Sequence, residues 1–367
     1  MRRRLAVLAL LVLCLFAAAP PVASAPSGLR IVDVRAAADF PLSLEFAIDA
    51  ESSSPIVDAR LLYQVDKMNY TLVTSEAWPS FVPSTTLAAS WTWDMRRATL
   101  PPGAVITYWW RVRDESGAVV ESTPRIISFD DDRYNWQEIG SSDVSLRWYD
   151  GGEAFAQQLL DVCHTAIEDL ARDVGTRVDR QIKVHIYASS SDLRQAMVYP
   201  QEWTGGVAFT DYGIVAIGIG PADTGWGVRA LRHELTHLVI YSTTFSPYGG
   251  LPTWLDEGLA MHNEGEAEEG FRRLLLQAAQ YDALLSLRTL SGPFSSDTAT
   301  AYLSYAESQS VVEYLLEEYG TDAVHTLLMS FRNGEAMDDA MTQSFGLTLD
   351  GLEVEWRASL QQELASA

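Results

Sequence analysis

Two residue types are nearly absent from this sequence, and each absence narrows the choice of protein class. The 367 residues include only two cysteines, Cys14 and Cys163, so a disulfide-rich scaffold is excluded and stability must come from a packed core. Lysine occurs only at Lys67 and Lys183, and 26 basic residues stand against 49 acidic ones, for a formal net charge of −23. Nucleic acids and anionic membranes bind basic surfaces, so neither is expected as a partner.

The N-terminal segment is typical of a signal peptide. Three arginines precede an apolar run over residues 5–19, and an A-x-A pattern ends at Ala25. Pro26 is unfavourable directly after a cleavage site, so the segment could instead remain as an N-terminal anchor, although a membrane-spanning helix needs about 20 apolar residues. We therefore expect a secreted or extracytoplasmic protein and leave attachment to the cell envelope open. Cleavage would leave Cys163 as the only cysteine, on the apolar side of a helical pattern, which favours a buried hydrophobe over a catalytic thiol.

The hydrophobic pattern predicts an α+β protein with two folded parts. After the signal peptide (residues 1–25), residues 27–134 alternate apolar and polar positions between short turn segments, which predicts an antiparallel β-sandwich of the immunoglobulin or fibronectin type. This part could be a spacer or a substrate- or surface-binding module. Residues 135–367 begin with strands and continue with helical spacing, which predicts a separate, mostly helical domain.

One helical pattern carries a metal-binding motif. The run Trp226 to Tyr241 contains His233-Glu234-Leu235-Thr236-His237. Histidines at i and i+4 project from one helix face, so both imidazoles can reach one metal, and Glu234 can take a proton from a water that the metal activates. A second helix follows and places Glu257 as a third ligand. Two histidines and one glutamate are an established catalytic zinc set, so we predict a Zn²⁺ site at His233, His237 and Glu257.

These two motifs, H-E-L-T-H and W-L-D-E-G-L-A, resemble those of gluzincin metallopeptidases, particularly the peptidase MA-like group, and more distantly those of the aminopeptidase N family. The resemblance extends from about Trp136 to the C-terminus. It implies a zincin-like domain that hydrolyses a peptide or protein substrate with Zn²⁺ as cofactor and Glu234 as general base. It also implies a tyrosine that assists the oxyanion, for which Tyr305 is the first choice and Tyr302 the second.

The resemblance also implies an edge strand that binds substrate, and the paired glycines Gly205 and Gly206 could allow a close backbone approach there. An ordinary turn entering a strand is an equally good interpretation. The run from Gly205 to Ala208 lacks the glutamate with which aminopeptidase N-like enzymes hold the substrate amino terminus. That departure favours an endopeptidase.

A second departure concerns the residues that orient the metal-binding histidines. Thermolysin-like gluzincins place an aspartate four residues after the glutamate ligand, where this sequence has Met261. Asn263, Glu264 or a backbone carbonyl could take its place, and the sequence does not choose among them. His262 is a rival ligand, but its spacing from Glu257 favours a surface position.

Two other functions compete with a peptidase. One is a catalytically weak or inactive zinc-containing binding protein at the cell surface, against which the intact Glu234 counts. The other is a zinc hydrolase that acts on a non-peptide amide. The sequence predicts neither the cleaved sequence nor the oligomeric state.

Overall fold

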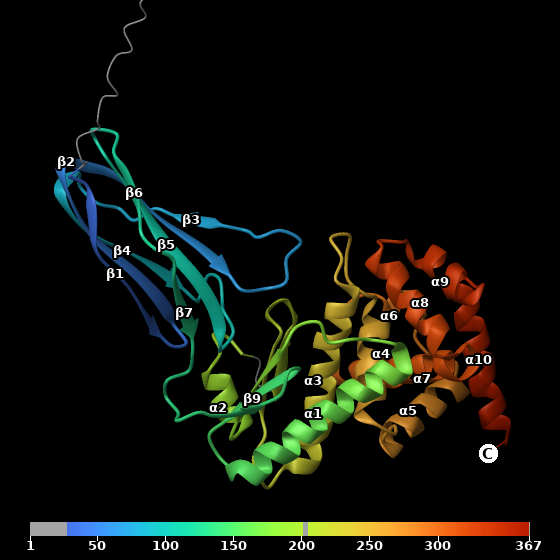
Figure 1. Cartoon of the computed structure of the whole chain (residues 1–367). Helices are drawn as coiled ribbons and strands as arrows, with labels where there is room; N and C mark the ends of the chain where they lie inside the picture. The colour runs from blue at the N-terminus through green and yellow to red at the C-terminus, as the bar shows by residue number, and fades with distance from the viewer. Residues whose placement is uncertain (1–27, 201–204, 367) are drawn as a thin grey trace, which may run out of the picture.

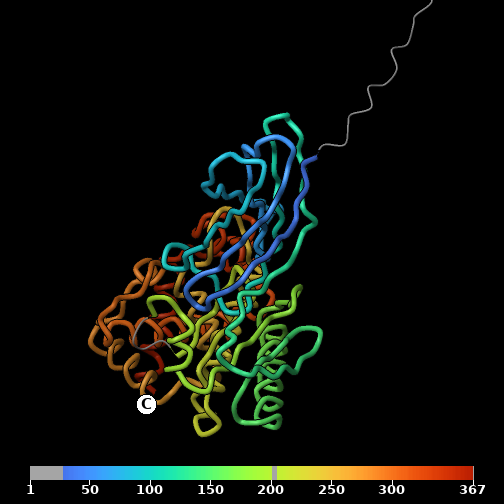
Figure 2. The backbone as a smooth tube through the Cα atoms, turned by 90° about the vertical axis from the view of Figure 1, so that its left-hand side faces the viewer, coloured from blue at the N-terminus to red at the C-terminus, as the bar shows by residue number. Residues whose placement is uncertain are grey.

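The computed structural model describes residues 28–200 and 205–366 (Figure 1). The signal peptide predicted for residues 1–25 lies outside these ranges. An N-terminal sheet occupies the upper part of the molecule in both views, and a second sheet with its helices occupies the lower part (Figures 1 and 2). The mixed α+β class expected from the sequence is therefore confirmed.

Seven antiparallel strands form the N-terminal sheet. They are β1 (Arg30–Asp39), β2 (Ser43–Val65), β3 (Ser75–Ala77), β4 (Ser84–Asp94), β5 (Ala104–Asp114), β6 (Val119–Glu121) and β7 (Arg125–Phe129). The first half of β2 pairs with β1 and β4, and its second half pairs with β3 and β5. The register of β2 against β4 shifts between Glu51 and Ile56, within a serine-rich segment. The long strand β2 therefore pairs with one set of neighbours before this segment and with another set after it.

The two halves of this sheet enclose an aromatic core. The Phe46 ring of β2 meets the Tyr108 ring of β5 edge-on at 4.9 Å, and β5 alternates buried and less buried positions along its whole length, as a half-buried strand requires. The antiparallel β structure expected here is present, but its strands form one continuous hydrogen-bonded sheet. The immunoglobulin or fibronectin type stays a prediction.

The second sheet has the order β11-β12-β10-β9-β8. Its strands are β8 (Gln137–Gly140), β9 (Val144–Trp148), β10 (Ile182–Tyr187), β11 (Gly206–Phe209) and β12 (Ile214–Gly218). The central strands β9, β10 and β12 are parallel, and β12 is buried throughout, as expected for a strand covered on both faces. The two outer strands, β8 and β11, are antiparallel to their neighbours, and β11 ends the sheet on one side. The predicted boundary near residue 134 falls between β7 and β8 and stays a prediction.

Helices make up most of the remaining chain. They are α1 (Gly152–Val174), α2 (Ser190–Gln195), the short 3₁₀ helix η1 (Thr210–Tyr212), α3 (Thr224–Thr244), α4 (Thr253–Glu264), α5 (Glu269–Gln280), α6 (Leu287–Leu290), α7 (Thr298–Glu318), α8 (Gly320–Arg332), α9 (Met337–Phe345) and α10 (Leu349–Ser366). Helix α1 buries an apolar face that includes Cys163. This cysteine is fully buried, as predicted, and its burial raises the pKa of the thiol to about 12. No helix in the described part of the chain is long and apolar enough to cross a membrane.

The loop between β2 and β3 joins the N-terminal sheet to the second part (Figure 1). The Met68 N–H donates to the carbonyl of Asp211 at 2.7 Å, next to the end of β11. The Tyr70 ring stacks on Phe245 at 4.6 Å, and its hydroxyl donates to the Phe245 carbonyl at 2.7 Å. Residues 66–74 thus contact both the end of the edge strand and the C-terminal end of α3, and we call this segment the bridging loop.

Candidate metal centre

Helix α3 carries both predicted histidine ligands on one face. His233 and His237 lie one turn apart, and their rings are 4.8 Å apart between centroids. The opposite side of the helix is anchored in the core by Leu231, Leu235 and Val239, all of which are buried. The helix therefore cannot rotate without exposing apolar surface, and the two imidazoles are held in place.

Helix α4 brings Glu257 to the same point. The next residue, Gly258, lies against α7, where a Cβ atom would overlap the Ser308 carbonyl oxygen. Trp254 at the start of α4 is fully buried in the hydrophobic core. The glycine allows the close packing of α4 on α7 that sets the position of the neighbouring glutamate.

The three side chains converge at distances that suit a metal ion. One ligand atom from each of His233, His237 and Glu257 lies within 4.8 Å of the others. Glu257 Oε2 is 3.4 Å from His233 Nε2 and 3.7 Å from His237 Nε2. A tetrahedral zinc ion with bonds of about 2.0–2.1 Å would hold its ligand atoms roughly 3.3 Å apart. Glu257 Oε2 is also buried with no hydrogen-bond partner in the described structure, so the donor set fits zinc.

A second layer of acids orients the histidines. His233 Nδ1 lies 2.8 Å from Glu264 Oε1, and Arg229 binds the other oxygen of Glu264 at 3.1 Å. His237 Nδ1 lies 3.1 Å from Asp256 Oδ2, which is within ion-pair distance. The imidazole ring is not oriented to form a hydrogen bond with this carboxylate. Of the alternatives that the sequence left open, Glu264 therefore contacts His233.

Asn263 belongs to a buried polar network behind the metal-binding residues. Its amide donates to the Thr236 hydroxyl at 2.7 Å, and its side-chain oxygen accepts from Arg232 at 3.0 Å. Arg232 also binds Asp169 of α1 at 2.6 Å. These contacts tie α3 to α4 and α1, so they fix the angle between the two helices that supply the ligands. The pairing of Arg232 with Asp169 could not be predicted from the sequence, because no local pattern marks partners 63 residues apart.

Without a cation, the centre is a buried cluster of acids and imidazoles. Burial opposes a charge on His233, but the nearby carboxylates of Glu257 and Glu264 outweigh that effect and raise its pKa to about 10. Burial also raises the pKa of Glu234, and the neighbouring histidines partly counter this rise. The cluster therefore favours bound positive charge, either as protons on the histidines or as a metal ion.

Glu234 lies between the metal-binding face of α3 and the edge strand. The backbone N–H of Ala208 in β11 lies near its carboxylate and lowers its pKa, against the larger effect of burial. At Gly206 a Cβ atom would come within 3.0 Å of Glu234 Cγ, and at Gly205 it would come within 2.6 Å of the Trp226 ring. Both glycines thus permit a close approach to α3, and their role in binding substrate stays a prediction. The strand itself lies at the sheet edge, as the resemblance implied.

Of the two predicted tyrosines, Tyr305 is the one near the centre. It is partly buried on α7 and packs edge-on against Phe294. Burial and the negative charges of Glu257 and Glu234 raise its pKa to about 12. Tyr302 is 54% exposed, and His262 pairs with Asp173 at 3.4 Å, away from the ligand cluster.

A comparison with protein families identifies the family of this chain. The sequence matches the model of the Peptidase MA superfamily over residues 162–362, more than half of the chain. The chain belongs to the Peptidase MA superfamily. The matched region of this superfamily member includes the two histidines and Glu257. A search of curated proteins found no match.

Matches among solved structures include zinc peptidases. An M1 zinc metallopeptidase from Deinococcus radiodurans is 12% identical, with a TM-score of 0.38, over 91% of this chain and 93% of that one. An aminopeptidase N family protein from Idiomarina loihiensis is 10% identical, with a TM-score of 0.30, over 87% and 68%. OgpA from Akkermansia muciniphila is 10% identical, with a TM-score of 0.21, over 28% and 27%, so this chain spans about a quarter of that protein.

Proposed function

We propose that this protein is an exported zinc peptidase that cleaves peptide bonds, with zinc held by His233, His237 and Glu257. The observation that carries the proposal is the convergence of these three donors beside Glu234, in a chain of the Peptidase MA superfamily. Bound zinc would supply the Lewis acid that polarises the scissile carbonyl and activates the attacking water. The remaining steps belong to side chains of this chain.

Glu234 is proposed as the general base. Its burial raises its pKa, which suits a carboxylate that must take a proton from water and then hand it to the leaving amine. Its side chain lies against Gly206 of β11, which keeps the carboxylate between the edge strand and α3. Tyr305 is proposed to donate its hydroxyl proton in a hydrogen bond to the developing oxyanion. Its raised pKa keeps it protonated at neutral pH for that role.

The substrate is proposed to be a peptide that extends along the free edge of β11. An edge strand offers unpaired backbone groups to an extended chain. Gly205 and Gly206 would form the start of this edge. Because the strand lacks an acid to hold an amino terminus, we expect cleavage within a peptide, which N-acetylated fluorogenic peptides would test.

The deciding experiment compares two variants of the zinc-loaded protein on a broad peptide library. Glu234→Gln should keep about one zinc per chain and lose turnover by at least about 10²–10⁴-fold, since a general base contributes that much. Glu257→Ala should lose zinc as well as turnover. Turnover retained in Glu234→Gln would refute the role of the base.

A zinc-containing surface-binding protein is the second candidate. If the wild-type protein binds zinc at this centre but cleaves no peptide in the library, that candidate is favoured. Hydrolysis of small amides without hydrolysis of peptides would instead favour a non-peptide amidase.

A further inference from the structure

An exposed tryptophan lies on the metal-binding side of α3. Trp226 is 53% exposed, although tryptophan is highly buried on average. It precedes His233 by about two helical turns, so both side chains project from the same side of the helix. At a rise of about 1.5 Å per residue, the two Cα atoms are roughly 10 Å apart along the helix. A large aromatic surface is therefore open to a ligand close to the metal centre.

The ring of this tryptophan reaches the start of the edge strand β11. A Cβ atom on Gly205 would lie 2.6 Å from Cη2 of Trp226, so the glycine and the indole are in close contact. The next residue has the same relation to the proposed general base, because a Cβ atom on Gly206 would lie 3.0 Å from Glu234 Cγ. Trp226 and Glu234 thus contact neighbouring residues of one strand, which are about 3.4 Å apart along it.

The hydrogen bonds of β11 indicate where a peptide can pair with it. The Gly218 N–H donates to the Gly205 carbonyl at 2.9 Å, so Gly205 directs its carbonyl towards β12. Backbone groups of successive residues in an antiparallel strand point to opposite sides, so those of Gly206 point to the free edge. A peptide that pairs with Gly206 lies beside Glu234 and brings its neighbouring residues within reach of Trp226.

The surroundings of the ring favour an apolar occupant. Burial of apolar surface contributes about 25 cal/mol per Å², and an exposed indole gains this energy when an apolar side chain covers it. Arg229, one turn further along α3, is already paired with Glu264 at 3.1 Å and with Glu268 at 3.2 Å. This arginine therefore offers no free charge to an acidic residue of a substrate.

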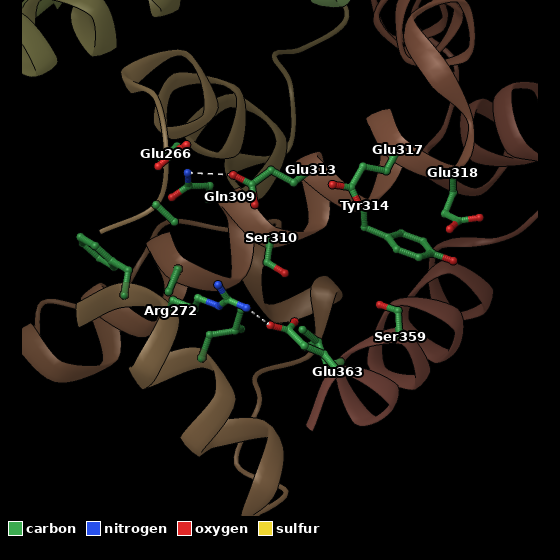
Figure 3. A pocket seen from close by; sticks show the side chains of 15 residues that line it. Glu266, Arg272, Gln309, Ser310, Glu313, Tyr314, Glu317, Glu318, Ser359 and Glu363 are labelled. Atoms are coloured by element: carbon green, nitrogen blue, oxygen red, sulfur yellow. Dashed lines mark hydrogen bonds and ion pairs between the residues drawn. The ribbon is translucent and has the colours of Figure 1, made fainter. Parts of the chain in front are cut away.

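A separate cavity between α5, α7 and α10 does not contribute to this region (Figure 3). Its volume is about 630 Å³, and several glutamates, including Glu313 and Glu363, line it. The metal-binding residues, Glu234 and Trp226 are not among its lining residues. A substrate that reaches the metal centre is thus expected at the free edge of β11 and not in this cavity.

We infer that Trp226 is a specificity-determining residue, whose indole ring binds a large apolar side chain of the peptide substrate within two residues of the scissile bond. The position follows from the strand, because Glu234 contacts Gly206 and Trp226 contacts the preceding residue. The inference rests on the proposed peptidase function and extends it by naming a feature of the substrate.

The first measurement compares N-acetylated peptides that carry leucine, alanine or lysine at one of the two positions on either side of the cleaved bond. At one of these positions, the zinc-loaded wild type should favour leucine over alanine at least tenfold in kcat/KM, since even one methylene in an apolar pocket is worth about 10–200-fold. Trp226→Ala should reduce this preference to less than about threefold, mainly through a higher KM for the leucine peptide. Trp226→Phe should retain part of it.

Trp78→Ala provides the matched control. Trp78 is 59% exposed and follows β3 of the N-terminal sheet, so its replacement removes a similar exposed ring without changing α3. This variant should keep the wild-type preference for leucine. Zinc content and melting temperature are measured for every variant, so a general loss of structure is recognised. Equal loss of preference in Trp78→Ala and Trp226→Ala would overturn the inference.

Peptide binding to zinc-loaded Glu234→Gln, measured by calorimetry, separates this inference from the peptidase function. If the wild type cleaves no peptide, a leucine preference in binding that is lost in the double variant E234Q/W226A would support the role of Trp226 and refute only the peptidase function. Cleavage or binding that shows no leucine preference, that favours lysine, or that keeps its leucine preference after Trp226→Ala would overturn the inference. If Glu234→Gln binds no peptide and the wild type cleaves none, both proposals fail.

Discussion

Replacing Glu264 by glutamine tests how the second layer supports the metal centre. The wild-type carboxylate has one oxygen 2.8 Å from His233 Nδ1 and the other 3.1 Å from Arg229, and its side chain is only 13% exposed. Glutamine keeps the shape, but its NH₂ group must face either the arginine or the imidazole N–H, both of which are donors. The variant therefore loses one of these two contacts and the negative charge that makes His233 a stronger ligand.

We expect zinc affinity to fall about 10–100-fold, because outer-layer partners of metal-binding histidines typically contribute that much. In free energy this is roughly 1.4–2.8 kcal/mol. The assay is competition for zinc with a chromophoric chelator at neutral pH, with wild type and variant measured side by side.

Glu268→Gln provides the matched control. Glu268 also pairs with Arg229, at 3.2 Å, but it is 57% exposed and contacts neither zinc-binding histidine. Its replacement removes the same charge and should leave zinc affinity unchanged. Equal affinity in Glu264→Gln and wild type, or equal losses in both variants, would refute the reasoning.

Three further predictions concern Glu234, Tyr305 and a buried acid on α7. Gly206→Ala should lower kcat while zinc stays bound, because the new methyl would press on the Glu234 side chain, and a wild-type kcat would contradict this. Tyr305→Phe should lower kcat with unchanged zinc content and melting temperature, whereas Tyr302→Phe, on an exposed side chain, should behave like wild type. Burial raises the pKa of Glu307 from its usual 4.5 to about 8, so the folded protein holds this proton more tightly than the unfolded chain. The free energy of unfolding should therefore fall as pH rises from about 4.5 to 8, and urea titrations of Glu307→Gln should show a shallower fall.

The convergence of His233, His237 and Glu257 could be predicted because its determinants are local. The i, i+4 spacing of His233 and His237 fixes their common face, and the W-L-D-E-G motif marks the helix that carries Glu257. The contact of Glu264 with His233 could not be chosen beforehand, since it depends on how α4 crosses α3. That crossing is set by Gly258 against α7 and by the buried network around Asn263, which are contacts between distant segments.

The N-terminal sheet could likewise be predicted only in part from the sequence. Alternation of apolar and polar residues predicted its strands, but the pattern does not reveal that β2 continues for 23 residues through a serine-rich register shift. The run Glu51-Ser52-Ser53-Ser54-Pro55 is typical of a turn, because serine and proline are common in turns. Pairing with two different sets of neighbours keeps it extended.

The bridging loop has a consequence for how this chain can change over evolutionary time. Met68 and Tyr70 contact the end of the edge strand and the end of α3 from a segment more than 140 residues earlier in the chain. A foreign module placed ahead of the second sheet would lack these contacts, even if it folded well and joined at the same residue. The sheet is therefore not an exchangeable attachment, and insertions or deletions in residues 66–74 should be tolerated less well than those in the other loops of the sheet.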